Sequence, residues 1–181
     1  MAQERFVWDV WDSPVSRLVF VVSTQGLYRL QFSSQTSLAL IEQELLDILP
    51  SDSSLEYDQE TVAPFLQQVK EYFAHKRKTF DLPLHMVGTS FQRSTWEALQ
   101  QIPFGQVCSY KDIAVRIGNP KAVRAIGGAN NRNPIPIIVP CHRVCGANGD
   151  LVGFGSGIDR KQFLLEHEGF VIEKNRLMEG T

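Results

Sequence analysis

Cysteine is scarce in this chain, and the little there is does not suit a disulfide framework. The sequence contains 3 cysteines, at Cys108, Cys141 and Cys145, all in its second half. Small secreted domains stabilised by disulfides carry larger, even-numbered sets of cysteines. We therefore expect reduced thiols and a cytoplasmic protein.

Long hydrophobic runs are also missing. No apolar stretch approaches the roughly 20 residues of a membrane span, and Met1 to Arg5 leads into a strand-like pattern without the apolar core of a signal peptide. Charged residues make up 21% and hydrophobic residues 43% of the 181 positions, which is ordinary globular composition. We expect no membrane association, and one large domain or two small ones.

Positive charge is concentrated in one segment, although the net charge is only −2. Residues 91–145 carry seven Lys/Arg against two Asp/Glu, whereas residues 1–90 carry seven against twelve. Asymmetry of this kind indicates a segment that faces a polyanion. Chance clustering of charges on a solvated face explains the same counts equally well.

The first half predicts an α/β domain over residues 1–86. Residues 6–32 show strand-like runs separated by turn residues, which is typical of an antiparallel meander. Apolar residues recur at helical spacing over residues 37–49 and again over residues 61–76. The polar stretch "SDSSLEYD" between the two helices predicts a loop.

A mostly helical second domain is predicted over residues 87–181. Its first helix, over residues 89–102, has either Thr89 or Ser90 as its N-cap. Two further helices follow. Ser109 can cap the first of them, and Gly118 suits its C-terminal end.

The capping and turn residues around these two helices are typical of a helix-turn-helix. Asn119 and Pro120 suit the N-cap and first position of the second helix. That helix is almost bare, because its surface consists of Ala122, Ala125, Gly127, Gly128 and Ala129. Bareness permits close approach, either of a neighbouring helix or of a groove as narrow as the DNA minor groove.

The stretch "IPIIVPCHRVCG", residues 135–146, raises the question of what Cys141 does. A buried structural thiol, a metal ligand and a nucleophile are all options. Cys141, His142 and Cys145 lack the spacing of a zinc site, so we expect no metal. The run "IPIIV" predicts a short buried strand, and Pro140 predicts a turn that exposes the thiol.

A nucleophilic Cys141 would need help to ionise. A free thiol has a pKa of about 8.5, so a neighbouring base or cation increases its reactive fraction. His142 and Arg143 are the candidates, and a bridging water would be a natural link between Cys141 and His142. The second nitrogen of such a base usually needs an acceptor, for which "LLEHEGF" offers Glu166 and Glu168. The residues alone do not choose between the two carboxylates.

At this point the motifs resemble a known family. The stretch "PCHRV", preceded by "NPIPII" and "SYKDIA…GNPKAVRAIGGA" and followed by "LLEHEG", is similar to the O6-alkylguanine-DNA alkyltransferases, or methylated-DNA–protein-cysteine methyltransferases. The resemblance covers residues 89–169 almost without gaps. It implies a ribonuclease-H-like first domain, with an antiparallel sheet plus helices, and a winged-helix-like second domain with a helix-turn-helix.

The resemblance also implies an activity. The protein would repair DNA by moving the alkyl group, usually methyl, from O6-alkylguanine in duplex DNA irreversibly to its own cysteine. Each molecule would react once, after flipping the damaged base from a minor-groove complex. It implies no cofactor and a monomer. Activity on O4-alkylthymine, cooperative assembly on DNA and the role of the tail after Phe170 are left open.

Catalytic roles carry over by position. Cys141 would accept the alkyl group, His142 would deprotonate it through a water, and Glu168 would orient the imidazole. Asn133 would brace the turn around the thiol. Tyr110 would press on the phosphate beside the lesion and donate its hydroxyl to guanine N3, or give up a proton there.

DNA-binding and pocket residues carry over in the same way. Arg124 would fill the space of the flipped base. The rest of the implied DNA surface consists of Tyr110, Lys121, Ala125, Gly128 and Asn130, and the implied alkyl pocket of Val144, Val152, Phe154, Gly155 and Ser156. The carbonyls of Cys141 and Val144 would accept from the guanine amine, and the N–H groups of Val144 and Gly155 would approach O6.

This chain departs from the family pattern at several of these positions. Phe154 stands where tyrosine is frequent, Val152 and Ser156 where glycine is common, and Asn130 where some members have a larger apolar residue. Three other classes fit less well. A non-catalytic lesion sensor would lack Cys141, a cysteine hydrolase would not explain the helix-turn-helix, and a transcription factor would need long polar side chains on its recognition helix.

Overall fold

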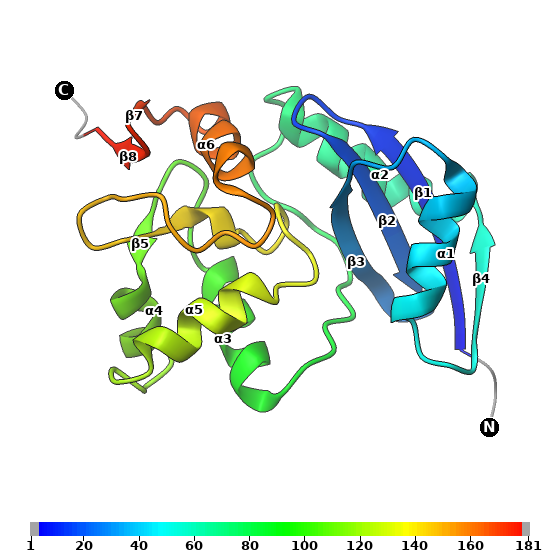
Figure 1. Cartoon of the computed structure of the whole chain (residues 1–181), viewed down its shortest axis with the longest axis horizontal. Helices are drawn as coiled ribbons and strands as arrows, with labels where there is room; N and C mark the ends of the chain where they lie inside the picture. Colours follow the sequence, from blue (N-terminus) through cyan, green and yellow to red (C-terminus); the bar gives the residue numbers. More distant parts are fainter. Residues whose placement is uncertain (1–3, 179–181) are drawn as a thin grey trace. The chain divides into compact units, whose positions relative to one another are not determined.

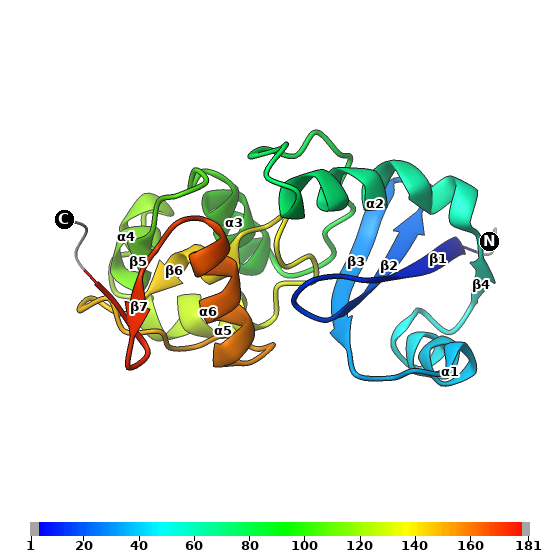
Figure 2. The same ribbon diagram turned by 90° about the horizontal axis from the view of Figure 1, so that it is seen from above.

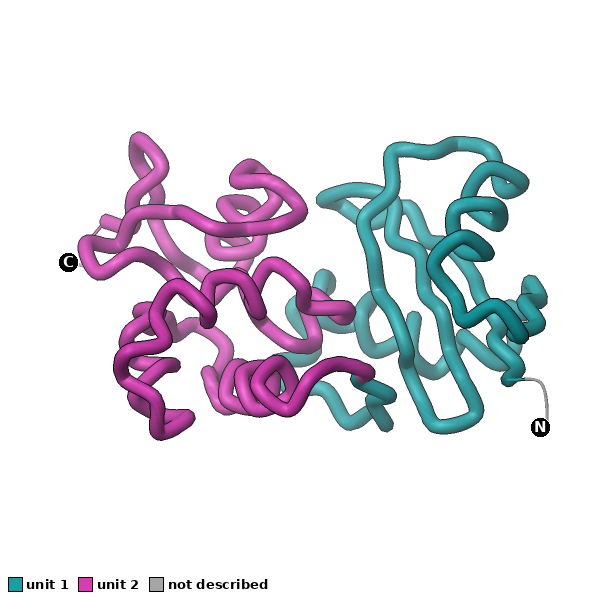
Figure 3. The backbone as a smooth tube through the Cα atoms, turned by 60° about the horizontal axis from the view of Figure 1, so that its bottom comes forward, with its two compact units in different colours: residues 1–86 teal, residues 87–181 magenta. Residues whose placement is uncertain are grey.

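The computed structural model describes residues 4–178, and the chain divides into two compact units, residues 1–86 and 87–181 (Figure 3). Within the described residues no helix is both long and apolar enough to cross a membrane.

The first unit is built on a four-stranded sheet with strand order β3-β2-β1-β4 (Figure 1). Strands β1 (Glu4–Asp12), β2 (Arg17–Ser23) and β3 (Gly26–Ser33) form the antiparallel meander that the sequence predicts. The predicted helices are also present, as α1 (Leu38–Ile48) and α2 (Gln59–Phe73).

The predicted loop between these helices is wrong, because part of it is strand β4 (Ser53–Tyr57). β4 pairs in parallel with β1, from Glu4 opposite Ser53 to Trp8 opposite Tyr57. β4 is an edge strand, paired with a neighbour on one side only, and such a strand can be largely polar. Its polar composition therefore resembles that of a loop. Leu55 supplies the contact with the core.

Helices α1 and α2 lie on opposite faces of this sheet (Figure 2). Successive strand side chains point to opposite faces, so both faces of the apolar strand β2 can be buried. Val19 and Val21 join Ile41 and Leu45 of α1 in one core cluster. α2 contacts β1 and β2 and buries its own apolar side, which includes Val69.

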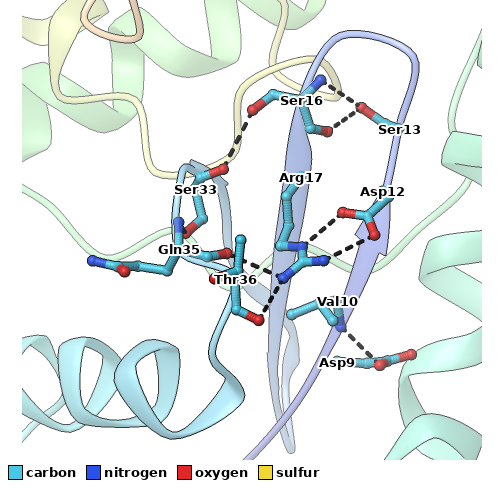
Figure 4. A network of polar contacts seen from close by, with 9 residues as sticks. All are labelled: Asp9, Val10, Asp12, Ser13, Ser16, Arg17, Ser33, Gln35 and Thr36. Carbon is cyan, nitrogen blue, oxygen red and sulfur yellow. Dashed lines mark hydrogen bonds and ion pairs between the residues drawn. The ribbon is translucent and has the colours of Figure 1, made fainter.

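Arg17 closes the β1–β2 hairpin (Figure 4). Its guanidinium donates two hydrogen bonds to Asp12, at 2.7 and 2.9 Å, and two more to the carbonyls of Gln35 and Thr36, both at 3.1 Å. The segment that follows β3 is thereby tied to the start of β2.

The second unit is mostly helical, as predicted. Its elements are α3 (Ser90–Gln100), β5 (Cys108–Ser109), α4 (Tyr110–Arg116), α5 (Val123–Asn131), a 3-10 turn (Cys141–Arg143), β6 (Val144–Cys145), α6 (Ile158–His167), β7 (Ile172–Glu173) and β8 (Arg176–Leu177). Ser109 caps α4 through a reciprocal pair of bonds with Asp112, and Gly118 follows the helix at φ 76°. Both predicted roles are confirmed.

Two local predictions in this unit are wrong. Asn119 and Pro120 do not start α5, whose N-cap is Ala122; they form a turn closed by Ala122 N–H donating to Asn119 O at 3.0 Å. Proline is favoured inside such turns for the same fixed φ that suits a helix start. The run "IPIIV" is not a strand but a buried turn, with Ile137 at φ 77°.

The tail after Phe170 forms a small hairpin, β7–β8, whose turn residues Lys174 and Asn175 both have positive φ. Leu151 N–H donates to Asn175 O at 2.8 Å, and Leu177 N–H donates to Gly149 O at 3.0 Å. The hairpin therefore holds the segment that leads into the glycine-rich stretch after Leu151.

The cap of α3 gives a stability prediction. Thr89, rather than Ser90, is the N-cap, and it forms a reciprocal capping box with Gln92. Thr89→Ala should lower the free energy of unfolding by about 1 kcal/mol, measured by urea denaturation. The neighbouring Ser90→Ala should change it by less than about 0.5 kcal/mol. An equal loss in both variants would contradict this assignment of the cap.

Candidate active site around Cys141

Cys141 opens the 3-10 turn and is buried, with 3% of its surface exposed. The prediction that Pro140 exposes the thiol is therefore wrong. The preceding turn packs Ile135, Ile137 and Val139 into the core, so the thiol follows directly from a buried segment. Burial makes it inaccessible to bulk solvent in this state.

Asn133 holds that turn together. Its Nδ2 donates to Val139 O at 2.7 Å, and its Oδ1 accepts from Ile135 N–H at 3.0 Å. Cys141 N–H donates to Val139 O at 2.8 Å. One amide thus satisfies backbone groups that a strand would otherwise pair, and it lies where bracing of the turn is expected.

Glu168 is the centre of a buried polar network. Its Oε1 lies 2.8 Å from His142 Nε2. Arg143 donates to both carboxylate oxygens at 2.9–3.1 Å, and Gly105 N–H donates to Oε2 at 3.1 Å. Arg143 also donates to Ile102 O.

The two candidate carboxylates are therefore distinguished by the structure. Glu168 is 7% exposed and contacts His142, whereas Glu166 accepts a hydrogen bond from Gln162 at the surface. Burial alone would raise the pKa of Glu168, but the hydrogen bonds donated by His142 and Arg143 and the charge of Arg143 outweigh it and hold that pKa at about 2. Glu168 is ionised.

His142 is neutral at physiological pH. Burial lowers its pKa, and the hydrogen bond to Glu168 offsets this only in part. Its Nε2 faces a carboxylate and so carries the proton. Its Nδ1 is buried and, within residues 4–178, has no hydrogen-bond partner. A neutral imidazole with a free acceptor nitrogen can take up a proton.

The thiol itself resists ionisation. Burial raises the pKa of Cys141 to about 11, although a hydrogen bond from Asn133 and the charge of Lys161 act in the opposite direction. At neutral pH roughly one thiol in ten thousand would be ionised. A base must therefore remove the proton for Cys141 to react.

Lys161 is the site residue that the sequence reasoning missed, whereas Arg143, considered there as a cation beside the thiol, pairs with Glu168 instead. Lys161 is fully buried and donates from Nζ to the carbonyls of Val144 and Val152. Burial lowers its pKa. The available signal was helical spacing, since Lys161 shares the inward face of α6 with Leu164 and Leu165. A lysine on the buried side of a helix usually has a specific partner.

The glycine-rich stretch forms a wall beside Tyr110. The Tyr110 hydroxyl donates to Val152 O at 2.8 Å, and burial raises its pKa. A Cβ on Gly153 would lie 2.5 Å from that hydroxyl, and one on Gly155 would lie 2.9 Å from Asn131 O. Both positions therefore require glycine. Phe154 is buried, Val152 is 44% exposed, and Ser156 O accepts from Arg160.

Helix α5 presents a bare, exposed face. Lys121, Arg124 and Ala125 are exposed. A Cβ on Gly127 would meet nothing within 4 Å, and one on Gly128 would meet only the end of the Arg132 side chain. Packing inside the described part of the protein therefore does not explain these glycines.

Asn130 departs from its expected place on this surface. It is 2% exposed, and its Nδ2 donates to the carbonyls of Cys141 and Gly153, both at 3.4 Å. The implied substrate acceptors Cys141 O and Val144 O thus already accept bonds, from Asn130 and Lys161.

Comparison with known proteins agrees with the motifs around Cys141. Residues 6–86 match the family model of the 6-O-methylguanine DNA methyltransferase ribonuclease-like domain, and residues 90–170 match that of its DNA-binding domain. The chain is a member of the methylated-DNA–protein-cysteine methyltransferase family. The two-domain fold expected from the resemblance is confirmed.

Relatives with this family name span most of the chain. The protein from Methanosarcina acetivorans is 44% identical over 160 residues, covering 88% of this chain and 96% of its own. The constitutive protein of Bacillus subtilis is 48% identical over 135 residues, covering 74% and 82%. The crystal structure of Mycobacterium tuberculosis OGT in complex with DNA superimposes with a TM-score of 0.76 at 40% identity, covering 91% and 92%.

In the part of the chain that the structure describes, no three His, Cys, Asp or Glu side chains come together as metal ligands. Cys108 and Cys145 are free thiols, and burial raises the pKa of each. Cys145 packs against Leu151 and Leu165 in an apolar cluster.

The depressed pKa of Glu168 predicts an acid sensitivity. A carboxyl whose pKa falls from 4.5 to about 2 on folding stabilises the protein above pH 4.5 and loses this contribution as the pH falls towards 2. The loss should be of the order of 3 kcal/mol. Urea denaturation at a series of pH values should show this slope in the wild type and not in Glu168→Gln.

Glu166→Gln is the matched control, because that carboxylate lies two residues away at the surface. It should keep the wild-type slope. If Glu166→Gln removed the slope instead, Glu168 would not be the carboxylate that carries it.

Proposed function

We propose that this protein repairs alkylated DNA by transferring the alkyl group from guanine O6 in duplex DNA to Sγ of Cys141. The observation that carries the proposal is the buried thiol next to a neutral His142 whose other nitrogen is held by ionised Glu168. Family membership supports the same reaction.

The proton has a route in this arrangement. The Sγ proton passes through a bridging water to His142 Nδ1, the imidazole atom that has no partner among residues 4–178. The imidazolium that forms is stabilised by Glu168, 2.8 Å from Nε2. His142 is therefore the general base and Glu168 the residue that orients it.

The transfer itself is a displacement at the alkyl carbon. An electron pair of Sγ forms the S–C bond while the C–O6 bond breaks and its pair stays on guanine. Burial raises the pKa of the Tyr110 hydroxyl and keeps it protonated, so it can donate a hydrogen bond to guanine N3 as this charge develops, once it turns away from Val152 O. Solvent then supplies the proton that completes guanine. A thioether is a poor leaving group, so Cys141 is not regenerated and each molecule reacts once.

DNA binding is proposed for the bare face of α5. Small residues at Ala125, Gly127 and Gly128 would allow close approach to a narrow groove, and exposed Arg124 would fill the position of an extruded base. Lys121 supplies charge for phosphates. We propose a cytoplasmic monomer acting on duplex DNA that contains O6-alkylguanine.

Label transfer tests the proposed reaction. Incubation with duplex DNA carrying radiolabelled O6-methylguanine should place one label per protein molecule on Cys141, measured by peptide mapping. Cys141→Ala should take no label and still bind the DNA. Cys145→Ala, which removes the neighbouring buried thiol, should be labelled like the wild type. Label on Cys145, or several turnovers per molecule, would refute the proposal.

The proposed role of Arg124 in base flipping can be tested by comparing a duplex substrate with a free base. Arg124→Ala should slow repair of duplex DNA by about tenfold or more, while reaction with free O6-benzylguanine should be nearly unchanged, because only the duplex needs a flipped state to be held. Both rates are measured in single-turnover assays.

Lys121→Ala serves as the comparison for Arg124→Ala. It should weaken duplex binding and reduce the slope of log affinity against log salt by about one. It should leave the rate of the saturated complex near that of the wild type. Equal losses of Arg124→Ala on both substrates would remove Arg124 from its proposed role.

A further inference from the structure

The segment after Phe170 forms the β7–β8 hairpin, drawn in red in Figure 1. The family model of the DNA-binding domain ends at residue 170, so this hairpin lies outside it. Each of its strands is two residues long, and an isolated hairpin of that size is not stable in water. The hairpin is therefore held by contacts with the rest of the second unit.

Residues 149–151 lie along the hairpin as a third strand. Leu177 N–H donates to Gly149 O at 3.0 Å, and Leu151 N–H donates to Asn175 O at 2.8 Å. Gly149 permits the close approach, because its φ is 79° and a Cβ there would lie 3.3 Å from the Cβ of Leu177. The backbone of this segment is thus fixed from both ends by the hairpin.

The two faces of this small sheet differ. On one face Arg176 lies opposite Asp150 on one side and opposite Glu173 on the other, so acid, base and acid alternate across the strands. Arg176 Nε lies 2.6 Å from Asp150 Oδ1. On the other face Ile172 and Leu177 pack against the buried cluster of Cys145, Leu151 and Leu165. The hairpin is anchored in the core of the unit and closed by charge at the surface.

Val152, the residue after this third strand, connects the hairpin to the active site. Its carbonyl accepts from the Tyr110 hydroxyl and from Lys161 Nζ, both at 2.8 Å. Lys161 also donates to Val144 O, beside the turn that carries Cys141. The position of one carbonyl therefore helps to set the positions of an ammonium and a hydroxyl near the thiol.

The stretch that begins with Val152 has little structure of its own. Residues 152–157 form neither helix nor strand and include three glycines, two of which have positive φ. Glycine leaves the backbone free to take many conformations. The stretch is fixed at its end by α6, which starts at Ile158, and at its beginning by residues 149–151.

We infer that the β7–β8 hairpin is a positioning element for alkyl transfer. By adding two strands to residues 149–151 it fixes the carbonyl of Val152, and through that carbonyl it holds Lys161 and Tyr110 in place beside Cys141. The hairpin acts through Val152 and not on the substrate. This inference rests on the proposed function and assigns a part in it to residues beyond the matched family model.

Shortening the chain tests this role. A protein that ends after Phe170 lacks the hairpin and should react with free O6-benzylguanine about tenfold more slowly, because small displacements of active-site groups cause losses of this size. A protein that ends after Met178 keeps the hairpin and should react like the wild type. The free base is used because its reaction does not require DNA binding.

Hydrogen exchange separates positioning from general destabilisation. In the protein that ends after Phe170, amides of residues 152–157 should exchange faster than in the wild type. Amides of α3, which packs against α4 and α5, should exchange at the wild-type rate. A purely structural loss would speed exchange throughout the unit.

The charge row gives a milder change in the full-length chain. Asp150→Lys places two cations opposite each other and should slow the reaction with the free base by about two- to threefold. Combining it with Arg176→Glu and Glu173→Lys rebuilds the alternation with opposite signs and should restore the wild-type rate. If the chain that ends after Phe170 does not fold, this pair of proteins decides the question.

The outcomes distinguish this inference from the proposed function. If the wild type takes no label from O6-methylguanine, the proposed function and the inference both fail. If the wild type is labelled and the folded protein without the hairpin reacts at the wild-type rate, only the inference is overturned. The same holds if exchange at residues 152–157 is unchanged, or if the triple charge reversal reacts as slowly as Asp150→Lys.

Discussion

The buried carboxylate of Glu168 is the interaction on which the rest of the site depends. It joins three segments far apart in the sequence: the end of α6, the turn that carries Cys141, and the chain after α3 at Gly105. Breaking such a network by removing one member typically costs 3–5 kcal/mol. Because Arg143 pairs with both carboxylate oxygens, the negative charge is compensated and His142 can stay neutral beside it.

In this arrangement the thiol of Cys141 is shielded from solvent at rest and still has the groups that could activate it nearby. Cys141 is buried and protonated at rest, which limits side reactions with small electrophiles and oxidants. The base, the hydrogen bond from Asn133 and the charge of Lys161 are nevertheless in place before DNA arrives.

Sequence alone predicts much of this because several signals are local. The cap at Ser109, the meander over residues 6–32 and the motif around Cys141 each depend on adjacent residues. The failures depend on distant ones. The apolar run "IPIIV" is compatible with a buried strand and with a buried turn. The hydrogen bonds between Asn133 and the backbone of Ile135 and Val139 stabilise the turn. Helical spacing places Lys161 on the buried face of α6, but its partners, the carbonyls of Val144 and Val152, follow only from the folded structure.

The central claim is that Glu168 holds His142 as a neutral imidazole with its proton on Nε2 and its Nδ1 free to accept. Nitrogen NMR of the protein labelled at histidine nitrogens measures this state directly. The account predicts, at neutral pH, a protonated Nε2 and an unprotonated Nδ1 for His142, with the reverse proton placement absent. An imidazolium, or a proton on Nδ1, would contradict the account, since neither form could accept the proton of Cys141.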